Sequence, residues 1–141
     1  MRKHSSLLMK ADGSRLDISE KKYCYAYMFS GCSSLTSAPE LPATTLAVDC
    51  YYYMFRNCTA LTAAPSLPAE TLVSWCYERM FNGCSSLASI DVSFSAWDPT
   101  NATDNWLMGV QASGTFTCPS TLPNTPRNVS HIPSGWTKVN K

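Results

Sequence analysis

The sequence has no long apolar run, few histidines and no glycine-rich phosphate loop. No hydrophobic stretch approaches the roughly 18–20 residues of a membrane-spanning helix, so we expect no membrane insertion. The two histidines, His4 and His131, lie near the ends of the chain. A histidine–cysteine nucleophile pair would require one end to fold back onto the centre. We therefore expect no enzyme, no catalytic residue and no cofactor.

Basic residues are scarce in the centre of the chain. Residues 24–110 carry two of them, Arg56 and Arg79, against seven acidic residues, although the formal charge of the whole chain is +1. A surface of that sign repels phosphate, so we expect no nucleic-acid partner. The apolar stretch 7–9 is too short for the core of a signal peptide. We expect either a fragment of a longer exported protein or a chain not exported by that route.

What the sequence does contain is an internal repeat. Three similar phrases, Cys24–Cys32, Cys50–Cys58 and Cys76–Cys84, each begin 26 residues after the previous one. Residues 24–49 and 50–75 agree at 15 of 26 positions. Such self-similarity predicts a stacked repeat array.

Each repeat has room for one short helix and one short strand. Apolar residues at i, i+4 and i+8, such as Leu46, Cys50 and Met54, are typical of a helix face, which predicts helices over 42–55 and 68–81. Pro39 and Pro65 lack an N–H group, so we expect strands of only three or four residues ending near them. Helices are wider than strands, so the array should curve with its strands inside.

The predicted fold is an α/β leucine-rich-repeat solenoid of about three full 26-residue rungs with caps. Its divisions are an N-terminal cap and three repeats, followed by a degenerate fourth rung with a C-terminal cap: 1–23, then 24–49, 50–75 and 76–101, then 102–141. In the last part we expect a cysteine-free helix over 103–108, a strand over 114–118 and a tail folded over the final rung. The apolar ends of the array could support self-association.

Six of the seven cysteines fall in two repeat registers, 24/50/76 and 32/58/84. Zinc ligands usually lie two to four residues apart and include histidine, so we expect no metal site. Packed helices are too far apart for a disulfide, whereas stacked strands are close enough. A disulfide within Cys32, Cys58 and Cys84 stays open, although a column of three favours free buried thiols.

Four columns of the repeat vary while the scaffold positions do not. They hold aromatic and charged residues, and tyrosine, tryptophan and arginine dominate binding hot spots. Tyrosines packed between neighbouring rungs, with only their hydroxyls in water, are the structural alternative. The candidate ligand-binding residues are Tyr27, Tyr52, Tyr53, Arg56, Trp75, Glu78 and Arg79.

The repeated phrase Met-Phe-x-x-Cys-x-x-Leu-x-x-Ala-Pro-x-Leu-Pro-Ala-x-x-Leu-x-x-x-Cys-Tyr, at 28–51 and 54–77, resembles the BspA-type leucine-rich repeats of bacterial surface proteins. Residues 105–136 are similar to the C-terminal end of such proteins from gut Bacteroides and relatives. The resemblance implies a right-handed solenoid at the cell surface or outside the cell, and adhesion to host proteins or other bacteria. It implies no catalytic residues.

Two functions from different classes are consistent with these features. The first is a non-enzymatic surface recognition module that binds a protein or glycan ligand through its curved face or its aromatic stripe. The second is a structural spacer or display domain within a longer surface or phage-encoded protein. Exposed, ordered aromatic side chains favour the first, and a smooth polar surface with apolar ends favours the second.

Overall fold

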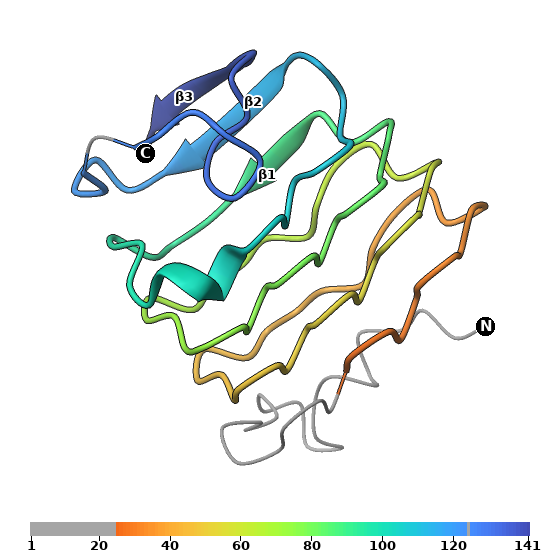
Figure 1. Ribbon diagram of the computed structural model, residues 1–141, viewed down its shortest axis with the longest axis horizontal. Coiled ribbons are helices and arrows are strands. Elements are labelled where there is room, and N and C mark those ends of the chain that lie inside the picture. The colour runs from red at the N-terminus through yellow and green to blue at the C-terminus, as the bar shows by residue number, and fades with distance from the viewer. Residues whose placement is uncertain (1–24, 124) are drawn as a thin grey trace.

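The computed structural model describes residues 25–123 and 125–141 (Figure 1). The predicted N-terminal cap, residues 1–23, and Cys24 lie outside the described residues. In Figure 1 the chain runs in layered coils that lie side by side from the orange segment to the blue one. None of the helices in the described part has the length and hydrophobicity to cross a bilayer.

Backbone hydrogen bonds join each coil to the next one in the 26-residue register. Tyr27 N donates to Tyr52 O at 2.9 Å, and Tyr53 N donates to Glu78 O at 3.1 Å. Arg79 N donates in turn to Asp104 O at 2.9 Å. The repeat in the sequence is therefore a repeat in space.

The predicted helices at 42–55, 68–81 and 103–108 are wrong. The described residues contain no α-helix, and their one helical element is the four-residue 3-10 helix η2 (Thr100–Thr103). The segments that hold the repeated phrases are instead runs of overlapping turns, in which alternate N–H groups donate to the residue three positions earlier. The N–H groups between them donate to the next coil. The predicted right-handed leucine-rich-repeat solenoid of strand-and-helix rungs is therefore also wrong.

The spacing of the coils explains why helices are absent. Phe55 stacks on Phe29 and on Phe81 with ring centroids 5.5 Å apart in both pairs. Packed helices need roughly 8–10 Å between their axes, so they do not fit at this separation. The array was expected to curve because helices are wider than strands. Since the described residues contain no α-helix, that expectation has no basis.

A four-residue period in the turns explains why the sequence pattern suggested helices. Asp49, Tyr53 and Asn57 have φ angles of 59°, 56° and 60°, so a left-handed residue recurs every fourth position. The residue after each of them points into the core, as Met54 and Cys58 do. A period of four lies close to the 3.6 of a helix, so both structures give the same apolar pattern.

Strands develop only where proline is missing. β1 (Ser89–Asp91), β2 (Gly114–Cys118) and β3 (Trp136–Asn140) form a parallel sheet in the order β1-β2-β3. In the preceding coil, Pro65 occupies the repeat position of Asp91, and pairing is reduced to isolated bridges at Ala63 and Leu67. Proline has no N–H group to donate to a ladder. The predicted strand at 114–118 is confirmed, and β3 shows that the tail folds back as expected.

The loop 128–131 takes the place of a further coil over the last run of turns. Leu107 N donates to Val129 O at 3.1 Å, and Thr103 Oγ1 donates to Ser130 O at 2.8 Å. Trp106 Nε1 donates to His131 O at 3.0 Å. The carbonyl groups of the loop therefore accept hydrogen bonds from the last coil, as the carbonyl groups of a further repeat would.

The left-handed glycines give a direct test of this geometry. Gly83 has a φ of +81°, and a Cβ there would collide with Asn57 Oδ1, whereas Gly31, with φ +79°, has nothing within 4 Å of the same point. We expect Gly31→Ala to lower the free energy of unfolding by about 1–2 kcal/mol through left-handed strain. Gly83→Ala should cost more because the Asn57 side chain must also move aside. Denaturant unfolding of both variants measures the difference, and equal losses would contradict the close contact between Gly83 and Asn57.

Candidate binding surface

Most of the predicted binding residues gather on one outer face of the turn runs. Tyr27, Tyr53, Arg79 and Asn105 form one column of the repeat, and all four have left-handed φ angles between 51° and 61°. Tyr27 is 47% exposed, whereas the invariant tyrosine of the same repeat, Tyr25, is 9% exposed. In this column Tyr27 is exposed and Tyr53, Arg79 and Asn105 are partly buried, whereas neighbouring aromatic columns supply the core.

Five of the predicted residues form one contact group, which we call the aromatic–arginine cluster: Tyr27, Tyr52, Tyr53, Arg56 and Arg79. The rings of Tyr27 and Tyr53 stack at 5.0 Å, and Tyr52 meets Tyr53 edge-on at 4.5 Å. The guanidinium carbon of Arg56 lies 4.9 Å from the Tyr53 ring centroid. That of Arg79 lies 5.7 Å from the same centroid. These are cation–π distances, so the cluster holds its aromatic rings in fixed positions.

The local environment keeps Tyr52 protonated and leaves one atom of Arg56 without a hydrogen-bond partner among the described residues. Burial, a hydrogen bond with Tyr27 and the nearby charge of Glu78 raise the pKa of Tyr52 to about 12. Arg56 Nε is buried and has no hydrogen-bond acceptor in the described part of the chain. The cluster therefore presents a neutral phenol and guanidinium groups at one surface.

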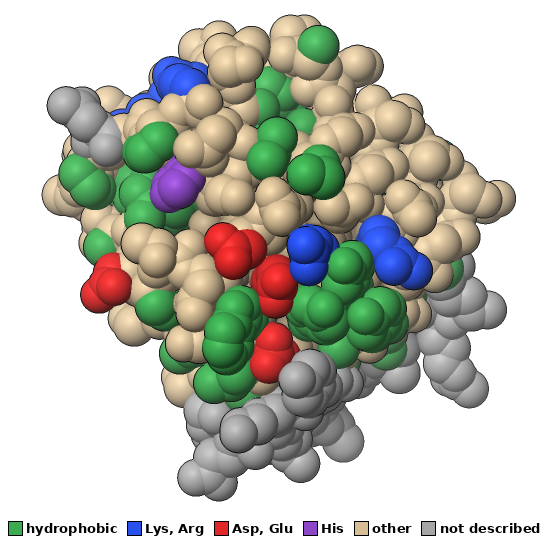
Figure 2. All heavy atoms as spheres, in the orientation of Figure 1, with side chains coloured by type: hydrophobic (Ala, Val, Ile, Leu, Met, Phe, Trp, Pro, Cys, Tyr) green, Lys and Arg blue, Asp and Glu red, His purple; other side chains and the backbone are tan. Residues whose placement is uncertain are grey.

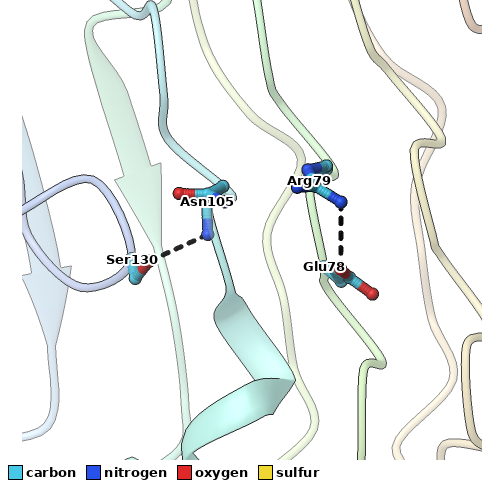
Figure 3. A network of polar contacts seen from close by, with 4 residues as sticks. All are labelled: Glu78, Arg79, Asn105 and Ser130. Atoms are coloured by element: carbon cyan, nitrogen blue, oxygen red, sulfur yellow. Dashed lines mark hydrogen bonds and ion pairs between the residues drawn. The ribbon is translucent and has the colours of Figure 1, made fainter.

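A row of carboxylates, from Asp49, Glu78 and Asp104, runs beside the cluster. Burial raises the pKa of Glu78, and the carboxylates of Asp104 and Asp49 raise it further against the opposing effect of Arg79. Arg79 Nη1 lies 3.2 Å from Glu78 Oε2 (Figure 3). On the following coil, Asn105 N donates to Ser130 Oγ at 2.9 Å, so the C-terminal loop borders this face (Figure 3). We call the three carboxylates the carboxylate row.

Trp75 stands apart from the aromatic–arginine cluster. It is 40% exposed and has a φ of 56°. It occupies the repeat position of Asp49, one coil further on, and within the described residues its ring stacks on no other aromatic ring. The structure therefore brings five of the seven predicted residues together, places Glu78 in the row and leaves Trp75 separate.

Sequence reasoning missed Asp49 and Asp104 as part of this surface. The acidic residues seemed scattered because no single column holds all three of them. Glu78 and Asp104, which are 26 residues apart, do share a column. Asp49 belongs to a different column, three positions earlier in the repeat. Only a comparison that combined these two columns would have grouped the three residues.

Four of the described cysteines are buried and offer no accessible nucleophile. Cys58, Cys76, Cys84 and Cys118 are buried free thiols, so no bridge joins Cys58 to Cys84. Cys84 Sγ donates to Phe55 O at 2.9 Å, and burial raises the pKa of this thiol to about 12. A thiol in this state is a poor nucleophile. Among residues 25–123 and 125–141, no group of three His, Cys, Asp or Glu side chains is placed to hold a metal ion.

Comparison with known proteins found no match to any family model, curated protein or solved structure. The resemblance to BspA-type surface repeats, and the cell-surface location that it implies, stay predictions.

Proposed function

We propose that the chain is a non-catalytic recognition module that binds a partner through the aromatic–arginine cluster. The observation that supports this proposal best is the ordered contact of aromatic and arginine side chains at an exposed face. Tyrosine and arginine are the residue types that contribute most to binding energy at interfaces. Fixed rings lose little conformational entropy on binding.

The cluster is not required by the core. The hydrophobic interior is built from other columns, including Phe29, Phe55 and Phe81, which are at most 1% exposed. Tyr27 and Tyr53 instead occupy left-handed backbone positions, where a bulky residue is strained. An exposed Tyr27 and a half-buried Tyr53 at strained surface positions favour recognition over a spacer, which needs neither residue.

Replacing two tyrosines of the cluster tests the proposal. Asn105 shows that asparagine fits this column at a φ of 51°, so Tyr27→Asn/Tyr53→Asn should keep the backbone and the stability. We expect the purified chain to bind one or more members of an array of proteins and glycans, and the double variant to bind at least tenfold more weakly.

Val139→Asn is the matched control because it replaces an apolar side chain, 41% exposed, on β3, outside the aromatic–arginine cluster. It should bind as the original chain does. Equal binding by all three chains, or no binding by any of them, would overturn the proposal.

A further inference from the structure

The guanidinium of Arg56 has aromatic contacts but no hydrogen-bond acceptor in the described part of the chain. Its Nε is buried without a partner. Its carbon lies 4.9 Å from the Tyr53 ring centroid and 5.7 Å from that of Tyr27. These cation–π contacts favour the positive charge, but they do not replace the acceptor oxygens that the N–H groups of an arginine require. The cluster therefore contains a cation whose donors are not satisfied by the described residues.

The two arginines of the cluster differ in this respect. Arg79 Nη1 lies 3.2 Å from Glu78 Oε2, so this guanidinium has a carboxylate of its own. Within the described residues the side chain of Arg56 forms neither a hydrogen bond nor an ion pair. Arg56 is half-buried, and its terminal nitrogens, unlike Nε, are not among the buried atoms without a partner. A ligand can therefore reach the outer edge of the Arg56 guanidinium.

The group that matches this edge is a carboxylate. Its two oxygens accept two parallel N–H bonds from a planar guanidinium, and the opposite charges strengthen both bonds. The contact also suits the surroundings, because the tyrosine rings beside Arg56 offer apolar surface to whatever carries the carboxylate. Figure 2 shows basic side chains against a patch of hydrophobic side chains, the class in which tyrosine is coloured, with acidic side chains along one side of the patch.

The carboxylate row limits how much negative charge the ligand can carry. A chain with many negative charges, such as an acidic polysaccharide, would place further charges against the row and be repelled. A single acidic side chain among apolar residues avoids this repulsion. Tyr27, which is 47% exposed, can contact those apolar neighbours. The charges therefore favour a protein segment over a polyanion.

We propose that Arg56 binds the carboxylate of an aspartate or glutamate side chain of a partner protein, while the tyrosines of the cluster contact the apolar residues next to it. This inference rests on the proposed function and narrows its ligand to a protein segment with one acidic residue among apolar ones.

NMR titration of the intact chain with the acetylated, amidated tripeptide tryptophan–glutamate–tryptophan tests the inference. The guanidinium is delocalised, so a carboxylate on its terminal nitrogens changes the signal of Arg56 Nε–H as well. We expect a saturable shift of that signal, and weaker binding with added salt. The tripeptide with glutamine in place of glutamate has nearly the same shape without the charge, so it should bind at least tenfold more weakly.

Arg56→Lys separates the shape of the guanidinium from its charge. Lysine keeps the positive charge but cannot form two parallel bonds, so the glutamate tripeptide should bind at least fivefold more weakly, as followed by the backbone amide signal of Tyr53. Lys141→Gln is the matched control, because it removes one positive charge from an exposed position outside the cluster. It should bind as the original chain does. Thermal unfolding checks that both variants are folded.

The inference is overturned by the absence of saturable binding, by equal binding of the glutamate and glutamine tripeptides, or by equal losses in Arg56→Lys and Lys141→Gln. It fails differently from the proposed function. If the tyrosine double variant loses its partner on the array while Arg56→Lys keeps both that partner and the tripeptide, the recognition module stands and the carboxylate ligand is wrong. If the tripeptide binds through Arg56 but the tyrosine variant retains every partner on the array, Arg56 binds carboxylates and the cluster is not the recognition surface.

Discussion

Replacing Trp106 with alanine should lower the free energy of unfolding by about 3–5 kcal/mol, the usual cost of removing a large buried aromatic side chain. Trp106 is fully buried and lies where the coils meet the C-terminal loop. Its ring stacks on Tyr77 at 5.9 Å and meets Phe116 of β2 at 6.1 Å. The variant should therefore lose both core packing and the attachment of the loop.

Denaturant unfolding measures the loss of stability, and limited proteolysis within 128–131 reports on the attachment of the loop. Trp106→Phe should keep most of the packing but lose the hydrogen bond to His131 O, at a cost of about 1–2 kcal/mol. Trp75→Asn is a control at an exposed tryptophan. Should Trp106→Ala prove no more costly than Trp75→Asn, the described role of Trp106 is wrong.

The second large effect is expected at Phe55. Its side chain is fully buried between Phe29 and Phe81, with interplanar angles of 8° and 1° to the two rings. Phe55→Ala removes both stacking contacts and leaves a cavity between coils, so we expect a loss of about 3–5 kcal/mol in the free energy of unfolding. Thermal and denaturant unfolding of the purified variant measure it.

Replacing Phe55 with leucine instead of alanine shows how much of the lost stability comes from the packing of this side chain. Phe55→Leu keeps an apolar side chain in the stack and should cost clearly less than Phe55→Ala. Tyr53→Asn, two residues earlier, changes an outward position of the same turn run. If Phe55→Ala and Tyr53→Asn destabilised the chain equally, the division into inward and outward columns would be contradicted.

The sequence predicted the repeat, its register and the five residues of the aromatic–arginine cluster, because these depend on which positions recur or vary every 26 residues. The buried Met54 and the outward Tyr53 follow from the columns alone. The prediction of helices in the repeated phrases was wrong. Leu46, Cys50 and Met54 are spaced as on a helix, and a four-residue turn period produces the same spacing.

The left-handed backbone was the missing information. Tyrosine, tryptophan and arginine rarely adopt positive φ, so Tyr53, Trp75 and Arg79 gave no sign of it. Asn57 and Gly83 do favour such angles, but residues of these types are also typical just after the C-terminal end of a helix, so they agreed with the predicted helices 42–55 and 68–81.

The outward columns have a consequence for how this surface can change. Positions 27, 53, 79 and 105 share one backbone conformation and hold tyrosine, tyrosine, arginine and asparagine, so the coil accepts different side chains at the same place. The inward columns carry the stability of the stack. Substitutions along the outer column can therefore change the side-chain chemistry of this face while the backbone and the core beneath it stay the same.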